Sequence, residues 1–244
     1  LLESAGGFAN VENDGAKQGI SRHLIRRRGG RAVPLVKDRT GDGDGKVVLK
    51  ITNNTISDNI AHEGGGIRAN GRYHGTPKSI VISGNTISNN IGVNGAGIEA
   101  DVGSAIISGN TIENNKSGEY DYNGSFELRG EGGGIKARDA GTQILNNIIK
   151  GNQAQYGGGI ADGGTITGNT IIGNTASSSG GGFYNRDGGG TFSDNYVLDN
   201  GGNFGIYIER GKIGVTGNVI AGNYKALRYS QSSNASASIS SNII

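Results

Sequence analysis

An asparagine-centred pattern recurs eight times along this chain of 244 residues. In every copy, one apolar residue stands three positions before the key asparagine and a second stands two positions after it. The key asparagines are Asn54, Asn85, Asn110, Asn147, Asn169, Asn195, Asn218 and Asn242, with spacings of 22 to 37 residues. A pattern that repeats at this period predicts a solenoid, in which each repeat buries its apolar residues against its neighbours.

The two apolar columns predict strands that meet at a corner. Ile166 and Ile171, for example, lie five residues apart around Asn169. Residues five apart on a straight strand point to opposite faces, so the chain must bend if both are to reach one core. Asparagine tolerates the left-handed backbone conformation of a tight corner, and we expect the bend at the key asparagine. Corners stacked about 4.8 Å apart would let each amide hydrogen-bond to the next, forming an asparagine ladder.

Two further features complete one coil of the repeat. A second asparagine stands five residues after the key one, as Asn174 does after Asn169, and predicts the end of the next strand. Glycine triplets such as Gly132–Gly134 introduce a third strand, because glycine permits sharp turns and close approach of coils. Glycine accounts for 48 residues and proline for 2, which disfavours helix and excludes collagen. We therefore predict an all-β fold, a right-handed parallel β-helix with three sheets, about eight coils and an asparagine ladder.

This prediction divides the chain into two parts. Residues 47–244 carry the β-helix repeats, and residues 1–46 are interpreted as a partial first coil with a long basic and acidic loop insertion. The acidic segment Asp-Arg-Thr-Gly-Asp-Gly-Asp-Gly contains Asp38, Asp42 and Asp44. Alternating carboxylates can converge on calcium, which is the one cofactor candidate. The full ligand set is missing, and an ordinary polar turn is the alternative.

The repeat units resemble those of a known group of proteins. Ile-Ser-Gly-Asn-Thr-Ile-x-x-Asn units, at residues 82–90 and 107–115, and Gly-Gly-Gly-Ile units are similar to right-handed parallel β-helix repeats. Such repeats occur in pectate-lyase-like enzymes, surface-epimerase-like proteins and the passengers of polymorphic outer-membrane proteins. The resemblance covers roughly residues 47–244 and implies the fold, whereas this scaffold carries many activities. In the enzymes that the chain resembles, a saccharide lies in a groove between loops that flank one sheet.

Two long loops are expected to flank the glycine-led sheet and to wall such a groove. One spans residues 70–79 and the other residues 116–131. Alternation from the buried isoleucines places a row of charged and aromatic residues on the outer face of this sheet. The outward positions are Arg68, Glu99, Lys136, Tyr184, Tyr207 and Arg228, with Asn70, Asp101, Arg138, Arg186 and Glu209 two residues on. Because aromatic rings stack on sugars and Arg pairs with carboxylates, the carbohydrate-binding candidates are Tyr73, His74, Tyr120, Tyr122, Tyr184, Arg186 and Tyr207. The alternative is a solvent-facing row of alternating charge that keeps the solenoid soluble.

Catalytic candidates on this face are weak. Glu99 and Asp101 point the same way and lie roughly 7 Å apart at their α-carbons, which permits a glycoside-hydrolase carboxylate pair. Lys136, Arg138 or His74 could serve as the base of a lyase or epimerase, with calcium to acidify the proton that it removes. The chain contains neither a paired-Asp hydrolase motif nor the Tyr-Gly-x-Asp-Pro-His motif of alginate epimerases. The sequence leaves enzymatic activity open and favours a protein without it.

Composition excludes several functional classes. The formal net charge is only +2, so net charge does not indicate nucleic acid as a partner. Cysteine is absent, which rules out disulfides and thiol chemistry. No apolar stretch reaches the roughly 18 residues needed to span a membrane.

Two functions remain from the sequence. The favoured hypothesis is an extracellular or cell-surface structural or adhesive solenoid, such as a filament subunit or surface passenger. Its partner would be a second copy stacked end to end, because neither end of the repeat array carries a cap. The alternative is a β-helix that binds or cleaves polysaccharide, with lyase, epimerase or hydrolase activity.

Overall fold

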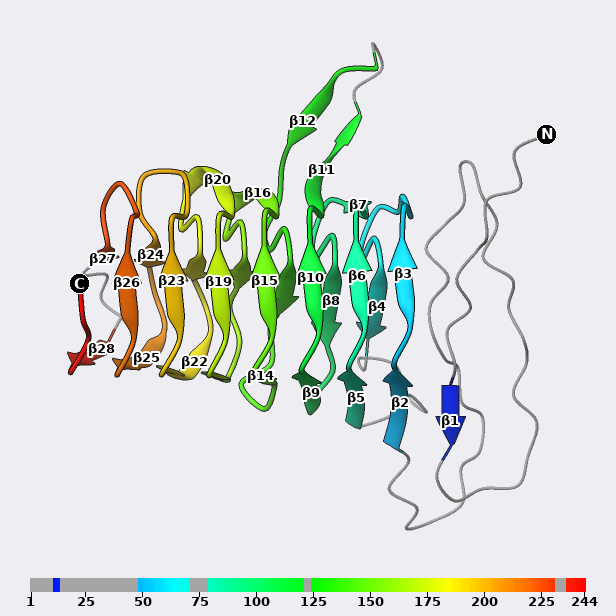
Figure 1. Ribbon diagram of the computed structural model, residues 1–244, viewed down its shortest axis with the longest axis horizontal. Helices are drawn as coiled ribbons and strands as arrows, with labels where there is room; N and C mark the ends of the chain where they lie inside the picture. The colour runs from blue at the N-terminus through cyan, green and yellow to red at the C-terminus, as the bar shows by residue number, and fades with distance from the viewer. Residues whose placement is uncertain (1–10, 14–47, 71–78, 121–123, 231–235) are drawn as a thin grey trace.

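The computed structural model describes residues 11–13, 48–70, 79–120, 124–230 and 236–244, and every regular element in these ranges is a β-strand. Figure 1 shows the strands stacked into successive coils along one axis, with the β11–β12 hairpin projecting from the stack. None of these ranges contains a helix that could cross a membrane. The predicted all-β parallel solenoid is therefore confirmed.

Three long sheets form the faces of the solenoid. The first sheet contains β1 (Val11–Asn13), β2 (Val48–Thr52), β5 (Ser79–Ser83), β9 (Ala105–Ser108), β14 (Gln143–Leu145), β18 (Thr165–Thr167), β22 (Gly189–Ser193), β25 (Lys212–Thr216) and β28 (Ser236–Ser240). The second sheet contains β3 (Thr55–Ser57), β6 (Thr86–Ser88), β10 (Thr111–Glu113), β15 (Ile148–Lys150), β19 (Thr170–Ile172), β23 (Tyr196–Leu198) and β26 (Val219–Ala221). The glycine-led sheet contains β4 (Ile67–Asn70), β8 (Ile98–Asp101), β13 (Ile135–Ala137), β17 (Ile160–Ala161), β21 (Phe183–Asn185), β24 (Ile206–Ile208) and β27 (Leu227–Tyr229).

A fourth, short sheet lies between the second sheet and the glycine-led sheet along the chain, where only three sheets were expected. Its strands are β7 (Ile91–Gly92), β11 (Lys116–Tyr120), β12 (Phe126–Leu128), β16 (Gln153–Tyr156) and β20 (Thr175–Ser179). Strand β12 pairs antiparallel with β11, so the described parts of the predicted loop at residues 116–131 form the two strands of a hairpin. The sequence did not indicate these strands because they follow the second asparagine without an apolar column of their own.

The number of coils is about six rather than the expected eight. The eight key asparagines mark eight passages of the chain through the same corner. A coil, in contrast, is the full turn between two successive strands of one sheet. The second sheet and the glycine-led sheet have seven strands each, and seven stacked strands are joined by six full turns.

Most of the proposed partial first coil, residues 1–46, lies outside the described residues. Its described part, β1, pairs antiparallel with β2. The other first-sheet pairings, from β2 to β28, are parallel.

The predicted ladder is present, and it is double. Along the key column, each side-chain nitrogen donates to the side-chain oxygen of the next asparagine at 2.8 to 3.1 Å. The second column, from Asn59 to Asn223, makes the same contacts at 2.9 to 3.2 Å. These contacts satisfy buried amides that would otherwise destabilise the core.

The corner itself differs in one detail from the prediction. The left-handed residue is the one before the key asparagine, for example Asn53 at φ 58° or Gly168 at φ 70°. The key asparagine does not have a positive φ and is free to point its side chain inward to the ladder.

The core is a narrow column of isoleucines, as expected. Ile82, Ile107 and Ile144 on the first sheet and Ile112 and Ile149 on the second sheet have no exposed surface. The columns lose this burial at the last copy, where Ile239 and Ile244 are exposed.

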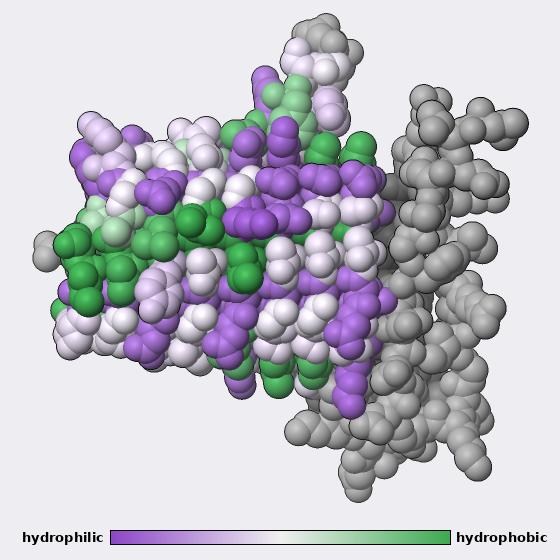
Figure 2. All heavy atoms as spheres, viewed as in Figure 1, coloured by the Kyte–Doolittle hydropathy of each residue, from purple (hydrophilic) through white to green (hydrophobic). Residues whose placement is uncertain are grey.

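The outer face of the second sheet changes character along the solenoid. Figure 2 shows polar residues over its early strands and an apolar area over its later strands. Thr86 and Thr111 occupy outward positions on early strands, whereas Ile148, Ile172 and Leu198 occupy them later. The outer face of the second sheet therefore becomes more apolar toward its later strands.

Candidate ligand pocket on the glycine-led sheet

The outer row of the glycine-led sheet is aligned as the sequence predicts. The paired positions along it are Arg68, Glu99, Lys136, Ala161, Tyr184, Tyr207 and Arg228, each on a successive strand. Ala161 brings no charged or hydrogen-bonding side chain to this row. It is fully buried and separates the early charged residues of the row from the aromatic ones.

Several residues of this row are buried although they point outward. Glu99 and Lys136 are each 4% exposed and Tyr184 is 1% exposed. Charged side chains are seldom buried unless they are paired, so their partners define the site. A plain solvent-facing row of alternating charge does not describe these residues.

Glu99 belongs to a cluster at the early end of the row. The guanidinium of Arg68 contacts Glu63 and lies 3.2 Å from the Glu99 carboxylate. Burial, followed by the negative charge of Glu63, raises the pKa of Glu99 above its usual range in spite of Arg68. Asp101 is also buried, on the same strand.

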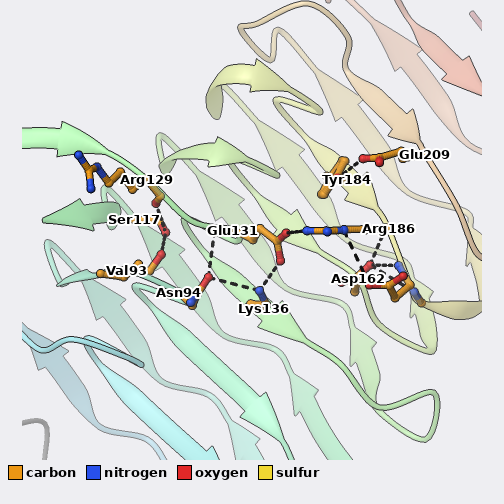
Figure 3. Close-up of polar contacts among 12 residues, drawn as sticks. Val93, Asn94, Ser117, Arg129, Glu131, Lys136, Asp162, Tyr184, Arg186 and Glu209 are labelled. Carbon is orange, nitrogen blue, oxygen red and sulfur yellow. Dashed lines mark hydrogen bonds and ion pairs between the residues drawn. The ribbon is translucent and has the colours of Figure 1, made fainter. Parts of the chain in front are cut away.

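A second cluster, around Glu131, links three coils (Figure 3). The Glu131 carboxylate contacts Nζ of Lys136 and lies 3.2 Å from Nη1 of Arg186. The side-chain oxygen of Asn94 accepts hydrogen bonds from Nζ of Lys136 at 3.3 Å and from the backbone N–H of Glu131 at 3.2 Å. Burial alone would raise the pKa of Glu131, but the contacts with Lys136 and Arg186 outweigh it and lower that pKa.

Asp162 holds the turn that carries Arg186. Its carboxylate accepts hydrogen bonds from the backbone N–H groups of Arg186, Asp187 and Gly188 at 2.7, 3.0 and 3.2 Å. Asp162 itself has a left-handed backbone at φ 56°, which turns its side chain toward this loop. Burial raises the pKa of Asp162, and the three backbone donors act in the opposite direction.

Aromatic side chains form the later part of the row. The rings of Tyr156 and Tyr184 stack with centroids 5.0 Å apart, and Tyr207 continues the row at 5.8 Å from Tyr184. The Tyr184 hydroxyl donates a hydrogen bond to Glu209, and burial is the largest cause that raises the pKa of Tyr184. Tyr120 instead packs on Phe126 in the projecting hairpin, with ring centroids 5.2 Å apart.

A pocket of about 480 Å³ lies beside Lys136 and Arg186. It is lined by Asn94, Gly130, Glu131, Lys136, Arg138, Gln155, Tyr156, Asp162, Arg186 and Asp187. The pocket joins three of the predicted candidates, Lys136, Arg138 and Arg186. Glu99, Asp101, Tyr120, Tyr184 and Tyr207 do not line it.

Sequence reasoning missed Asn94, Glu131 and Tyr156, although a signal was present. Each stands directly before the first glycine of a glycine-led unit. These residues form a column beside the outer row. Within it, the backbones of Glu131 and Tyr156 pair as a parallel β-bridge between neighbouring coils.

Other predicted positions lie outside the described residues. These are the saccharide candidates Tyr73, His74 and Tyr122 and the calcium candidates Asp38, Asp42 and Asp44. Within the ranges that the structure does describe, no group of three His, Cys, Asp or Glu side chains could hold a metal ion.

The comparisons with known proteins add no family to this geometry. No family model matches the sequence, and neither a curated protein nor a solved structure matches it. The structure confirms the β-solenoid fold that the resemblance implied, and membership of the pectate-lyase-like or polymorphic outer-membrane repeat families is not shown.

Proposed function

We propose that this chain is an extracellular adhesive β-solenoid that binds an acidic polysaccharide at the pocket on the glycine-led sheet, without cleaving it. One observation carries this proposal: Arg138 is exposed at a pocket that also contains an aromatic ring. No ion pair of Arg138 is found among the described residues. Its charge acts on the carboxylate of Glu99, and an exposed guanidinium that is not ion-paired is available to a carboxylate of a ligand.

The rest of the pocket suits a sugar ring. Tyr156 stacks on Tyr184 with one face, and its ring is also part of the pocket wall. Gln155 adds an amide that can donate to and accept from hydroxyl groups. An apolar ring face beside a few polar groups is the usual composition of a small-molecule site.

The carboxylates of the pocket favour binding over hydrolysis. Glycosidases use one carboxylic acid and one carboxylate placed about the scissile bond. Here Glu131 is engaged by Lys136 and Arg186, and Asp162 accepts three backbone hydrogen bonds. These contacts engage Glu131 and Asp162, so we expect neither to act as the acid or base of glycoside hydrolysis. Asp187, the third carboxylate that lines the pocket, lies 3.6 Å from Arg210.

A panel of immobilised polysaccharides tests the proposal. We expect the purified chain to bind uronate-containing polymers and to bind their neutral counterparts at least about tenfold more weakly, a difference of ~1.4 kcal/mol. Arg138→Ala should remove the preference for the acidic polymers. Lys212→Ala, which removes an exposed cation on the first sheet, should leave it intact.

Two results would contradict the proposal. One is equal binding of acidic and neutral polymers by the wild type. The other is release of unsaturated or reducing ends from the polymer, because the chain would then be an enzyme. End-to-end stacking of copies and calcium binding stay predictions from the sequence.

A further inference from the structure

Three side chains of the Glu131 cluster form an arrangement that the proposed function does not use. Asn94 follows β7 in one coil, Lys136 is the middle residue of β13 in the next coil, and Glu131 precedes β13. Their reactive groups converge at the base of the β11–β12 hairpin (Figure 3).

Lys136 has the position of a nucleophile. Its side chain is 5% exposed, and its Nζ contacts the Glu131 carboxylate and lies 3.3 Å from the side-chain oxygen of Asn94. Transfer of one proton from Nζ to the adjacent Glu131 carboxylate produces a neutral amine. A desolvated neutral lysine is a strong nucleophile.

Asn94 has the position of an electrophile. Its side-chain oxygen accepts a hydrogen bond from the backbone N–H of Glu131 at 3.2 Å. A donor at this oxygen stabilises the negative charge that develops when an amide carbon is attacked. Gly130 at the base of the hairpin lets this oxygen approach closely, because a Cβ at that position would lie only 3.0 Å from the oxygen.

We propose that Lys136 and Asn94 form an intramolecular isopeptide bond, with Glu131 as the proton carrier. Nζ of Lys136 bonds to Cγ of Asn94, and the bond from Cγ to Nδ2 breaks. Glu131, protonated by the Lys136 ammonium before the attack, gives this proton to Nδ2, which leaves as ammonia. Glu131 then takes the second proton from the attacking nitrogen, which keeps one hydrogen as the new amide N–H. The reaction exchanges one amide for another and requires no oxidant, metal or cofactor.

The bond would join two successive coils. The two residues are 42 positions apart, and the segment between them includes the projecting hairpin. A covalent bond here closes that segment into a loop and restricts the unfolded chain as a disulfide does, in a protein that has no cysteine. This inference does not depend on saccharide binding.

Intact-mass measurement of the purified chain tests the bond. After incubation at neutral pH, the wild type should be lighter than its sequence mass by one ammonia, and proteolysis should yield one peptide pair joined through Lys136 and Asn94. Lys136→Arg, Asn94→Ala and Glu131→Gln should each have the full sequence mass. Lys150→Arg is the matched control, because Lys150 pairs with Glu113 at 2.9 Å on the second sheet, and it should still lose ammonia.

Folding of each variant is checked by circular dichroism, and Glu131→Gln keeps the shape of the side chain it replaces. Three outcomes would overturn the proposal. A wild type at full mass shows that no bond forms. The mass gain of deamidation shows that water, rather than Lys136, attacks an asparagine. A loss of ammonia that persists in Lys136→Arg without a joined peptide indicates a succinimide at Asn94–Gly95.

Discussion

The side chain of Asn169 donates to the side-chain oxygen of Asn195 in the next coil at 3.0 Å. The same nitrogen donates to the backbone oxygen of Ile144 in the preceding coil at 2.9 Å. One amide thus connects three successive coils, and the backbone N–H of Asn169 adds a second bond to Asn195 at 2.9 Å.

Removal of this amide should destabilise the solenoid. Asn169→Ala leaves the hydrogen-bonding groups of both neighbours without a partner in a buried site, which should cost about 1 to 3 kcal/mol in the free energy of unfolding. Thr170→Ala, on the outer face one residue later, should cost less than about 0.5 kcal/mol. Urea unfolding of the two variants measures the difference, and equal losses would contradict the structural role of the ladder.

Gly130 tests how tightly the hairpin base packs on the neighbouring coil. It has φ 73°, and a Cβ would lie 1.8 Å from the backbone oxygen of Val93. Gly173 has a similar φ of 63° but open space around its Cβ position. We expect Gly173→Ala to cost about 1 to 2 kcal/mol for the left-handed backbone, and Gly130→Ala to cost clearly more. Thermal unfolding compares them, and a smaller loss at Gly130 would show that the hairpin base can shift freely.

Glu99 should make stability depend on pH. Because burial and Glu63 raise its pKa in the folded chain, Glu99 contributes stability below the ordinary glutamate pKa and loses it as the pH rises through the raised value. Glu99→Gln lacks this loss, so its melting temperature relative to the wild type should rise from acidic to neutral pH. Glu119→Gln, on the exposed hairpin, is the control. A relative melting temperature of Glu99→Gln that falls over this range would show the opposite sign.

Much of the fold is readable from the sequence because it repeats. Each apolar column and each asparagine column is sampled eight or seven times, so the ladder and the core follow from local rules. The outer row on the glycine-led sheet also follows, since alternation on a strand fixes which residues share a face.

The pocket could not be predicted in the same way. It depends on Glu131 reaching Lys136 in its own coil and Arg186 two coils away, and a column pattern does not show which charges will pair. The burial of Glu99 and Lys136 likewise results from neighbours on other strands. The left-handed corner residue lies one position before the predicted one. It is asparagine, aspartate, glycine or serine in different copies, so it forms no column of a single residue type that the sequence would reveal.

The most direct test of saccharide binding at this pocket is a calorimetric titration with an acidic oligosaccharide. Tyr156→Ala removes the ring that lines the pocket, whereas Tyr196→Ala removes an exposed ring from the second sheet. We predict that Tyr156→Ala weakens binding at least about tenfold, or ~1.4 kcal/mol, and that Tyr196→Ala leaves the affinity unchanged. Equal affinities for the wild type and Tyr156→Ala would contradict the pocket as the binding site.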